Sequence, residues 1–343
     1  MDELGWTPEL AAELEPGLRP GRVAAAHRAA FDVLCEGGAA IRTRLPGRMA
    51  HYDEVDVAVG DWVGLSDGLI RSVLPRRSAL VRTSAGLTSR PQTLAANVDV
   101  AFVVTSLGPD LEPRRLERYL VTIWESGASP EIVLTKADRF DDVSDMVLEV
   151  ESVALGVPVH VVSSVSGDGV DGVRARVAAG RTAVLIGSSG VGKSTLVNRW
   201  LGSEVMVTQE TRADDDEGMH TTTSRQLLLL PGGGLVIDTP GIRELQLGVA
   251  SDEAFDEAFS DVEELAAQCR FNDCEHRTEP GCAVRSALAD GSLARERYAS
   301  WQKLQRELAS IARRTDARLR KEERKRWGQI SKDARARTRH RQN

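Results

Sequence analysis

Residues 187–194, GSSGVGKS, form a glycine-rich stretch that ends in a lysine and a serine. Glycines let successive backbone N–H groups wrap a phosphate, and a helix that starts at the end of the stretch adds its positive N-terminus. Lys193 would reach the β- and γ-phosphates of a nucleotide, and Ser194 would bind Mg²⁺. The apolar residues 183–186 precede the stretch, as a phosphate loop requires. The predicted phosphate-binding residues are Gly187, Ser188, Ser189, Gly190, Val191, Gly192, Lys193, Ser194 and Thr195.

Residues 135–138, TKAD, match a motif that selects guanine. The carboxylate of Asp138 would accept hydrogen bonds from guanine N1–H and the exocyclic amine, and adenine offers no matching pair of donors. Lys136 would pack its stem along the base, and Thr135 stands where asparagine is usual. The next predicted strand is followed by two serines, where a backbone amide would meet the guanine oxygen. The predicted base-binding residues are Thr135, Lys136, Ala137, Asp138, Ser163 and Ser164.

Residues 238–241, DTPG, form a DxxG motif after the apolar residues 235–237. Asp238 would hold Mg²⁺ through water, and the amide of Gly241 would contact the γ-phosphate. Residues 218–223 are polar and without an apolar period, which is typical of a switch segment. One threonine of that segment would complete the magnesium shell. The predicted magnesium ligands are Ser194, Thr222 and Asp238.

The order of these motifs along the chain is unusual. The TKAD motif precedes the phosphate loop by about fifty residues, and DTPG follows the loop. Ordinary GTPases run from the phosphate loop to DxxG and then to the guanine motif. The same parts in a rotated order predict a circularly permuted GTPase.

The position after DTPG is Ile242. Many GTPases carry a glutamine near this position that orients the attacking water. Isoleucine cannot do so, and we therefore expect slow intrinsic hydrolysis unless another group is supplied. His220, in the switch sequence, is the candidate catalytic residue. The alternative is a histidine that faces solvent or contacts a partner.

A second cluster of reactive residues lies toward the C-terminus. Cys269, Cys274, His276 and Cys282 fall within fourteen positions and supply three thiolates and an imidazole. This set is enough for a closed tetrahedral Zn²⁺ site with a structural role, because no coordination position is left for a substrate water. A metal site is favoured over disulfides because the N-terminus does not resemble a signal peptide.

The 343-residue chain has a net charge of −7, but its charge is unevenly distributed. Residues 303–343 contain fifteen Lys/Arg and five Asp/Glu, and the rest of the chain is acidic. Such a basic segment favours an anionic partner such as nucleic acid, although a solvated helical face is the alternative. No apolar run approaches the roughly 20 residues needed to cross a bilayer. We expect a cytoplasmic monomer with no membrane partner.

The elements that must position these motifs are of two kinds. Short β-like segments between residues 21 and 90, including 31–34 and 55–59, predict a small barrel, with an OB-fold as the first choice and an SH3-like barrel as the alternative. After residue 97, strands alternate with helices, which predicts a mostly parallel sheet with crossovers. Residues 227–230 and 235–237 predict an antiparallel hairpin at one edge.

The fold class expected is therefore a multidomain α/β protein. The predicted parts are a flexible segment (1–20), an OB-fold RNA-binding domain (21–92), a circularly permuted GTPase domain (93–248), a helical zinc-binding domain (249–302) and a basic C-terminal helix or tail (303–343). An acidic helix is expected over residues 252–267.

The chain resembles the ribosome small-subunit-dependent GTPase A (RsgA) family over residues 21–301. The resemblance rests on TKAD, the phosphate loop, HTTT at 220–223, DTPG, and FNDCEH at 271–276. It implies that the OB-fold and zinc domain grip the small ribosomal subunit and its rRNA on either side of the GTPase. It also implies that the subunit stimulates weak GTP hydrolysis, which drives release late in subunit maturation.

Two other functions fit parts of the same pattern. One is an RNA-binding OB/zinc module in which the nucleotide is mainly a structural or regulatory ligand. The other is a P-loop ATPase or a nucleotide-dependent RNA-modifying enzyme. Asp138 argues against ATP, and the sequence offers no second catalytic constellation.

Overall fold

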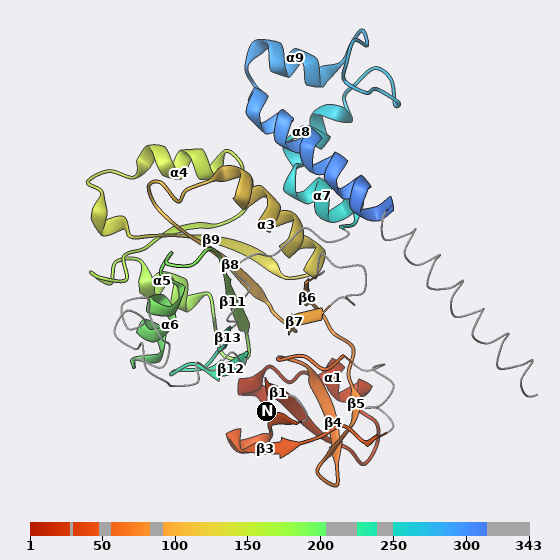
Figure 1. Ribbon diagram of the computed structural model, residues 1–343, viewed down its shortest axis with the longest axis vertical. Helices are drawn as coiled ribbons and strands as arrows, with labels where there is room; N and C mark the ends of the chain where they lie inside the picture. Colours follow the sequence, from red (N-terminus) through yellow and green to blue (C-terminus); the bar gives the residue numbers. More distant parts are fainter. Residues whose placement is uncertain (28–29, 48–55, 83–91, 204–224, 239–249, 314–343) are drawn as a thin grey trace, which may run out of the picture. The chain divides into compact units, whose positions relative to one another are not determined.

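The computed structural model describes residues 1–27, 30–47, 56–82, 92–203, 225–238 and 250–313 (Figure 1). The described residues fall into two compact units. The first unit draws on residues 1–247 and 251–261, and the second draws on residues 248–250 and 262–343. Within the described part, no helix is long and apolar enough to cross a membrane.

The first twenty residues, expected to be loosely held, contain two short helical elements. A 3₁₀ turn over Asp2–Leu4 is followed by α1 over Pro8–Glu13. Thr7 caps α1 by accepting a hydrogen bond from the Leu10 amide. The side chains of Leu4 and Leu10 are buried. This burial of apolar surface ties the segment to the first unit, contrary to the expectation.

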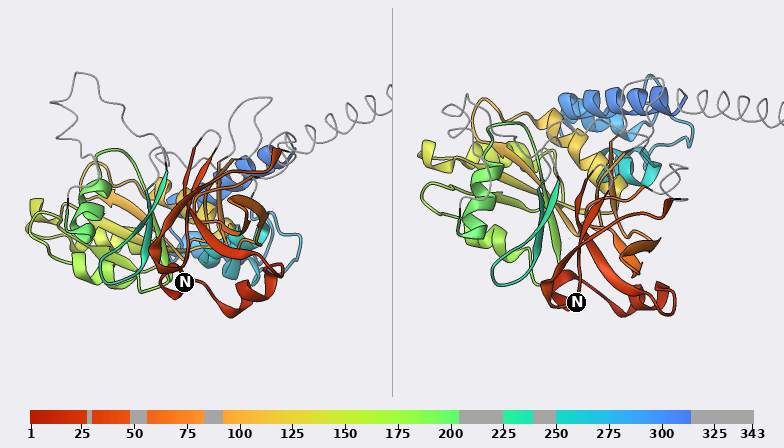
Figure 2. Two further views of the ribbon diagram at one scale, coloured as in Figure 1. Left: turned by 90° about the horizontal axis from the view of Figure 1, so that it is seen from below. Right: turned by 60° about the horizontal axis from the view of Figure 1, so that its bottom comes forward.

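Five short strands form a small barrel, as the sequence predicted (Figure 2). These are β1 (Arg19–Ala26), β2 (Phe31–Leu34), β3 (Ala40–Thr43), β4 (Trp62–Ser66) and β5 (Leu69–Val73). β1 pairs antiparallel with β2 and β4, β2 pairs with β3, and β4 pairs with β5. A bridge between Arg44 and Leu69 links the end of β3 to β5 and closes the circuit. The closed five-stranded circuit is that of an OB-type barrel.

The predicted strand at residues 55–59 is wrong, because the described part of it belongs to a turn before β4. Gly60 has φ +95°, and a Cβ at this position would lie 2.1 Å from the carbonyl oxygen of Ala96. Asp61 is fully buried, and its carboxylate accepts a hydrogen bond from the Ala58 amide at 2.7 Å. The left-handed backbone of Gly60 and the hydrogen bond to Asp61 form a turn, and a turn interrupts the extended backbone of a strand. The apolar residues of this segment nevertheless alternate as they do in a strand.

A mostly parallel sheet in the order β10-β9-β8-β11-β13-β12 makes up the rest of the first unit's core. Its strands are β8 (Val100–Ser106), β9 (Ser129–Thr135), β10 (Val159–Val161), β11 (Thr182–Ile186), β12 (Gln226–Leu229) and β13 (Leu235–Asp238). All neighbours are parallel except β12 and β13, which confirms the predicted hairpin. Two further strands, β6 (Ala79–Arg82) and β7 (Gln92–Ala96), pair with each other in a separate small sheet.

The barrel and the parallel sheet share hydrogen bonding at one place. β1 pairs antiparallel with β12 through Ala25 and Gln226. β12 therefore has a strand neighbour on each of its sides, β13 in the sheet and β1 in the barrel.

Helices cover both faces of the parallel sheet (Figure 1). They are α3 (Pro113–Ser126), α4 (Ser144–Glu151), α5 (Val170–Ala175) and α6 (Lys193–Leu201). α5 and α6 pack on one face, where Phe102, Leu185 and Trp200 belong to a single buried cluster. α3 contacts β8 and β9, and α4 contacts β10, on the other face. This arrangement buries the strands on both sides, which explains their continuous apolar sequences.

The acidic stretch 252–267, predicted as one helix, forms two. α7 covers Asp252–Ala258 and α8 covers Ser260–Ala266. Phe259 lies between them with φ −127° and ψ 34° and is fully buried. Its ring lies 4.9 Å from that of Phe255. The non-helical backbone of Phe259 therefore ends the first helix, and the local sequence pattern does not show this break.

The second unit is helical around a short irregular stretch. α9 covers Ala283–Asp290, and a longer helix covers residues 295–313. Val284 of α9 and Leu304 of the longer helix are buried. The indole N–H of Trp301 donates to the carboxylate of Glu263 at 2.8 Å.

A single buried arginine joins the barrel to the parallel sheet. Arg22, on β1, is 1% exposed. Its guanidinium donates to the carbonyl oxygen of Asn97 at 3.1 Å, to that of Gly60 at 3.4 Å and to the hydroxyl of Thr182 at 2.7 Å. It also donates to the carbonyl of Leu4. One side chain thus connects the N-terminal segment, the barrel and the start of β11.

The aromatic surroundings of Arg22 complete its site. Its guanidinium lies 5.2 Å from the centre of the Trp62 ring, and the Trp6 ring meets Trp62 edge-on at 4.9 Å. Burial lowers the pKa of Arg22, and the charge of Asp99 offsets part of this effect, so that the pKa is about 10. The group therefore remains a cation at neutral pH.

We expect Arg22→Met to destabilise the first unit by about 3 kcal/mol, because four oxygen acceptors lose their donor inside the protein. Urea unfolding followed by tryptophan fluorescence measures this change. Arg19→Met is the matched control, since Arg19 lies on the same strand and is exposed. Its effect should stay within about 0.5 kcal/mol. Equal stability of the two variants would contradict the role given to Arg22.

Candidate nucleotide-binding site and metal centre

The predicted nucleotide motifs meet at the carboxyl edge of the parallel sheet. β9 ends at Thr135, the first residue of TKAD, β11 ends directly before Gly187, and β13 ends at Asp238. The register pairs Ser106 of β8 with Thr135, so β8 ends beside the base motif. Ligands of open α/β sheets bind outside the carboxyl ends of the strands. The sheet therefore brings together motifs that are far apart in the chain.

The phosphate loop is held close to β8. Gly187 has φ +149°, and a Cβ here would lie 2.0 Å from the carbonyl oxygen of Val104, so only glycine fits. The ammonium group of Lys193 donates to the carbonyls of Gly187 at 2.8 Å and Ser188 at 2.6 Å. The loop thus curls around the lysine at the N-terminus of α6. This arrangement of cation, amides and helix end suits a phosphate.

The other loop residues surround that position. Ser189 and Gly190 are exposed at the tip of the loop, and Val191 is buried beneath it. Ser194 and Thr195 lie in the first turn of α6. Residues at these places can offer amides and hydroxyls to a phosphate chain and its cation.

Thr135 ties the base motif to the phosphate loop. It is 2% exposed, and its hydroxyl donates to the carbonyl of Val191 at 2.5 Å. The carbonyl oxygen of Thr105 lies 3.3 Å from the same hydroxyl. The threonine, noted in the sequence only as a replacement for asparagine, therefore has a bridging role of its own.

Asp138 meets the serine after the next strand. The hydroxyl of Ser163 donates to one carboxylate oxygen of Asp138 at 2.6 Å, and it accepts from the amide of Ser166 at 3.1 Å. The hydrogen bond orients the carboxylate and leaves its second oxygen for a base. Lys136 has φ +63°, and its ammonium group lies 3.9 Å from the carboxylate of Asp110. The structure thus brings TKAD and Ser163 together.

Two arginines that no sequence motif marks brace these loops. Arg199 of α6 donates to the carbonyl of Ser164 at 2.9 Å and to that of Val165 at 2.8 Å. Arg115 of α3 donates to the hydroxyl of Ser188 at 2.9 Å. Arg199 lies on the helix that follows the phosphate loop and Arg115 on the helix that follows β8, but no residue pattern in the sequence marks either arginine.

Three predicted residues lie outside the described part of the chain. These are His220, predicted for catalysis, Thr222, predicted for magnesium, and Gly241, predicted for the γ-phosphate. Asp238, the last residue of β13, is described and half-buried.

The three cysteines and the histidine of the second unit form one cluster. The ligand atoms of Cys269, Cys274, His276 and Cys282 all lie within 4.8 Å of one another. The sulfurs of Cys269 and Cys282 are 3.8 Å apart, and they lie 3.6 Å and 3.4 Å from Nδ1 of His276. A tetrahedral ion with metal–sulfur bonds of about 2.3 Å needs sulfurs about 3.8 Å apart. The donor set and its spacing fit such an ion.

The thiols of this cluster have unequal acidity. Partial burial and the two neighbouring sulfurs raise the pKa of Cys274 to about 11. Burial acts in the same direction on Cys269, but backbone hydrogen bonds from Val284 and Ala283 outweigh it and lower the pKa of that thiol. Three thiolates at this spacing repel one another, and a divalent cation removes that repulsion. A metal ion is therefore the natural counter-charge for the cluster.

We expect Thr135→Val to weaken the binding of GTP and GDP about tenfold, because the Val191 carbonyl loses its donor while the shape of the side chain is kept. Titration with fluorescent nucleotides measures both constants. Thr122→Val is the matched control, since its hydroxyl donates to the carbonyl of Arg118 within α3. Unchanged affinity in Thr135→Val would show that the bridge does not position the loop.

We expect Cys274→Ser to lower the metal content of the purified protein and to make the second unit more sensitive to protease, with nucleotide affinity unchanged. Elemental analysis and limited proteolysis test this. Cys35→Ser is the control, because Cys35 lies in the barrel core and is not one of the four cluster residues. A full metal content in Cys274→Ser would contradict the four-ligand site.

Comparison with known sequences agrees with this geometry. The family model described as "RsgA GTPase" matches residues 73–248, and one described as "50S ribosome-binding GTPase" matches residues 182–315. A protein of Streptomyces avermitilis named "Small ribosomal subunit biogenesis GTPase RsgA" is 47% identical over 94% of this chain and 90% of its own length. A Listeria innocua protein named "Small ribosomal subunit biogenesis GTPase RsgA 1" is 45% identical over 92% of this chain and 91% of its own.

Solved structures show the same architecture. YjeQ from Thermotoga maritima has a TM-score of 0.64 and 28% identity, over 85% of this chain and 98% of that one. YloQ, described as a circularly permuted GTPase, has a TM-score of 0.62 and 25% identity, over 86% of this chain and 96% of that one. The motifs, the sheet topology and the 45–47% identity over more than nine-tenths of the chain all point to the same family. This chain belongs to the RsgA GTPase family.

Proposed function

We propose that the chain is a GTP hydrolase that binds the small ribosomal subunit and assists its late maturation, with hydrolysis driving its release. The observation that carries this proposal is the carboxyl edge of the sheet, where the TKAD motif follows β9, the phosphate loop follows β11 and Asp238 ends β13. Relatives 45–47% identical over most of the chain are named as small ribosomal subunit biogenesis GTPases, which supports the proposal.

The nucleotide is held by two groups of residues. Asp138 pairs with guanine, and Ser163 fixes the orientation of its carboxylate through the 2.6 Å hydrogen bond. Lys193 and the loop amides hold the phosphates. Mg²⁺ accompanies GTP, and its assigned ligands are Ser194, Thr222 and Asp238.

Hydrolysis requires a group that orients the attacking water. Ile242 cannot supply it, and His220 is the side chain of this chain that we assign to the step. We infer that the subunit stimulates a slow intrinsic reaction by ordering the switch sequence around His220. GTP favours docking, and GDP favours release.

The remaining parts bind RNA and stabilise the fold. We assign residues 21–92 and the basic residues 303–343 to rRNA contacts. In the sequence, the N-terminal segment 1–20 precedes the first of these, and the GTPase at 93–248 lies between the two. Within residues 249–302 the cluster of three cysteines and one histidine holds a structural Zn²⁺. The protein acts as a monomer in the cytoplasm, where subunits mature.

Steady-state GTP hydrolysis with and without purified small subunits tests the proposal directly. We expect stimulation of at least about tenfold by small subunits and none by large subunits. In the presence of small subunits, His220→Ala should lose most of this stimulation and keep its GTP affinity.

Each outcome of this assay has a distinct meaning. GTP binding without turnover under any condition would favour an RNA-binding module in which the nucleotide is a structural ligand. Full stimulation of His220→Ala would remove that residue from the mechanism and point to a group supplied by the subunit.

A further inference from the structure

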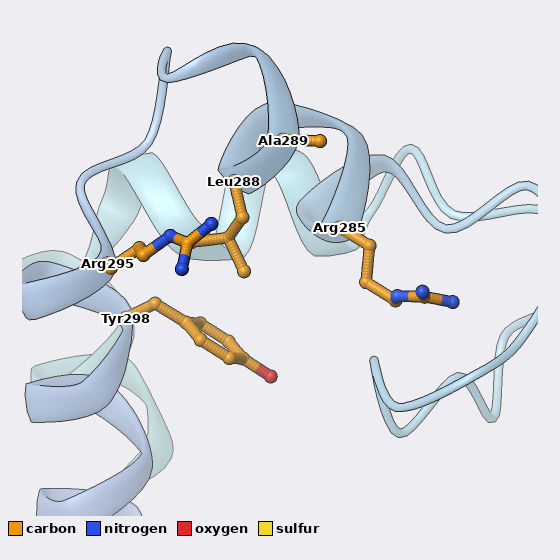
Figure 3. Close-up of a pocket in the computed structure, with 5 residues that line it drawn as sticks. All are labelled: Arg285, Leu288, Ala289, Arg295 and Tyr298. Atoms are coloured by element: carbon orange, nitrogen blue, oxygen red, sulfur yellow. The ribbon is translucent and has the colours of Figure 1, made fainter.

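Figure 3 shows a hollow of about 330 Å³ in the second unit, between α9 and the helix over residues 295–313. Its lining includes Arg285, Arg295 and Tyr298. The guanidinium of Arg285 points away from the hollow and from Arg295, so the two charges do not converge on one ligand (Figure 3). The base-binding end of the nucleotide site is different, because the hydrogen bonds of its polar groups show which of them can still bind a ligand.

Two polar groups near the TKAD motif are available to a guanine base. The Asp138 carboxylate accepts the Ser163 hydroxyl at 2.6 Å, which orients the carboxylate and leaves lone pairs for guanine N1–H and the exocyclic amine. In the loop after β10, the amides of Ser163 and of residues 165–167 all donate to oxygens of the same loop. The Ser164 amide has no such acceptor in the described structure, so it can donate to guanine O6.

A further acceptor of guanine, N7, faces a different part of the site. N7 belongs to the five-membered ring, which lies between the Watson–Crick edge and the ribose with its phosphates. When Asp138 holds that edge and residues 187–194 hold the phosphates, N7 faces the place where these two segments meet. Thr135 lies at that place, since its hydroxyl contacts the Val191 carbonyl and a Cβ on Gly192 would lie 3.7 Å from its side chain.

The Thr135 hydroxyl has no proton left for N7. A hydroxyl carries one proton. The hydroxyl oxygen lies 2.5 Å from the Val191 carbonyl oxygen and 3.3 Å from that of Thr105, so the proton goes to Val191. The lone pairs that remain cannot bond to N7, because N7 is itself an acceptor. The side chain is also 2% exposed, which leaves it no room to turn toward a base.

Neighbouring side chains do not supply the missing donor. The Lys136 ammonium lies 3.9 Å from the Asp110 carboxylate, and the Ser163 hydroxyl donates to Asp138. The hydroxyl oxygen of Ser164 is enclosed within the protein. In the part of the site that the structure describes, N7 therefore meets no side-chain donor.

We propose that Thr135 makes this site recognise guanine without its N7 atom. Asp138 and the Ser164 amide select the N1, amine and O6 positions, while the Thr135 hydroxyl holds the phosphate loop. An asparagine at position 135 would carry two N–H protons and could donate one of them to N7. The site therefore accepts guanine nucleotides that are altered at N7. This inference rests on the proposed binding of GTP and defines the substrate class of that site more closely.

Equilibrium binding of GTP and 7-deaza-GTP to the full-length protein tests the inference, because 7-deaza-GTP replaces N7 by C–H and keeps the Watson–Crick edge. We expect the two Kd values to agree within about threefold. ITP, which lacks the exocyclic amine, is the control and should bind about tenfold more weakly than GTP, because Asp138 loses one donor. A Kd for 7-deaza-GTP more than about threefold above that for GTP would overturn the inference.

Two variants separate the bridge to the phosphate loop from a contact with the base. Thr135→Ser keeps the hydroxyl, so the ratio of the Kd for 7-deaza-GTP to that for GTP should stay at about one. Thr135→Asn should raise this ratio to about ten, because its amide can donate to N7 of GTP but meets only C–H in 7-deaza-GTP. A general loss of affinity cancels in the ratio. A ratio of about one in Thr135→Asn would overturn the role given to position 135. If Thr135→Asn does not fold, the wild-type comparison still decides.

The nucleotide series separates this inference from the proposed function. Preference for GTP over ATP and ITP, combined with weak binding of 7-deaza-GTP, would refute the inference and leave the GTPase intact. Equal binding of ATP and GTP would instead refute base recognition by Asp138, and with it the proposed GTPase.

Discussion

The parallel pairing of β8 with β9 on one side and β11 on the other is the constraint from which the nucleotide site follows. Parallel neighbours end at the same edge of a sheet, so the segments after them meet regardless of their order in the chain. Base recognition follows β9 and phosphate binding follows β11, with the end of β8 between them. A rotated order of motifs therefore changes which loops are covalently joined, while the neighbours in space stay the same. This is why permutation preserves the chemistry.

Two polar contacts between residues far apart in the sequence connect the parts of the first unit. Arg22 reaches Thr182, 160 positions away in the chain, and Thr135 reaches Val191. Both contacts are buried, where a hydrogen bond that loses one partner is costly. The first couples the barrel to the strand that leads into the phosphate loop. The second couples base recognition to that loop. A change in the barrel thus has a short structural route to the phosphate loop.

The sequence was sufficient to predict those elements and site residues for which local pattern and motif chemistry agree. The hairpin around residues 231–234 lies where it was expected, because proline, glycine and apolar periodicity act locally. The predicted strand at 55–59 failed because the contact of Gly60 with Ala96 is not local. Sequence pattern also gave no sign of the role of Arg199, which depends on how α6 packs beside the loop that follows β10. The chemistry of the site was thus predictable from the sequence. The contacts by which side chains of other elements hold its loops in place were not.

The pairing of β1 with β12 has a consequence for solubility. β12 is the antiparallel last strand of the nucleotide-binding sheet, and its outer edge is occupied by the barrel at Ala25 and Gln226. An uncovered edge strand offers unpaired backbone donors and acceptors to any other chain, and it is a common start of strand-to-strand aggregation. By pairing with β12, the barrel therefore protects the edge of the nucleotide-binding sheet from pairing with other chains. A chain cut between the two would expose that edge, and its isolated GTPase part would tend to self-associate.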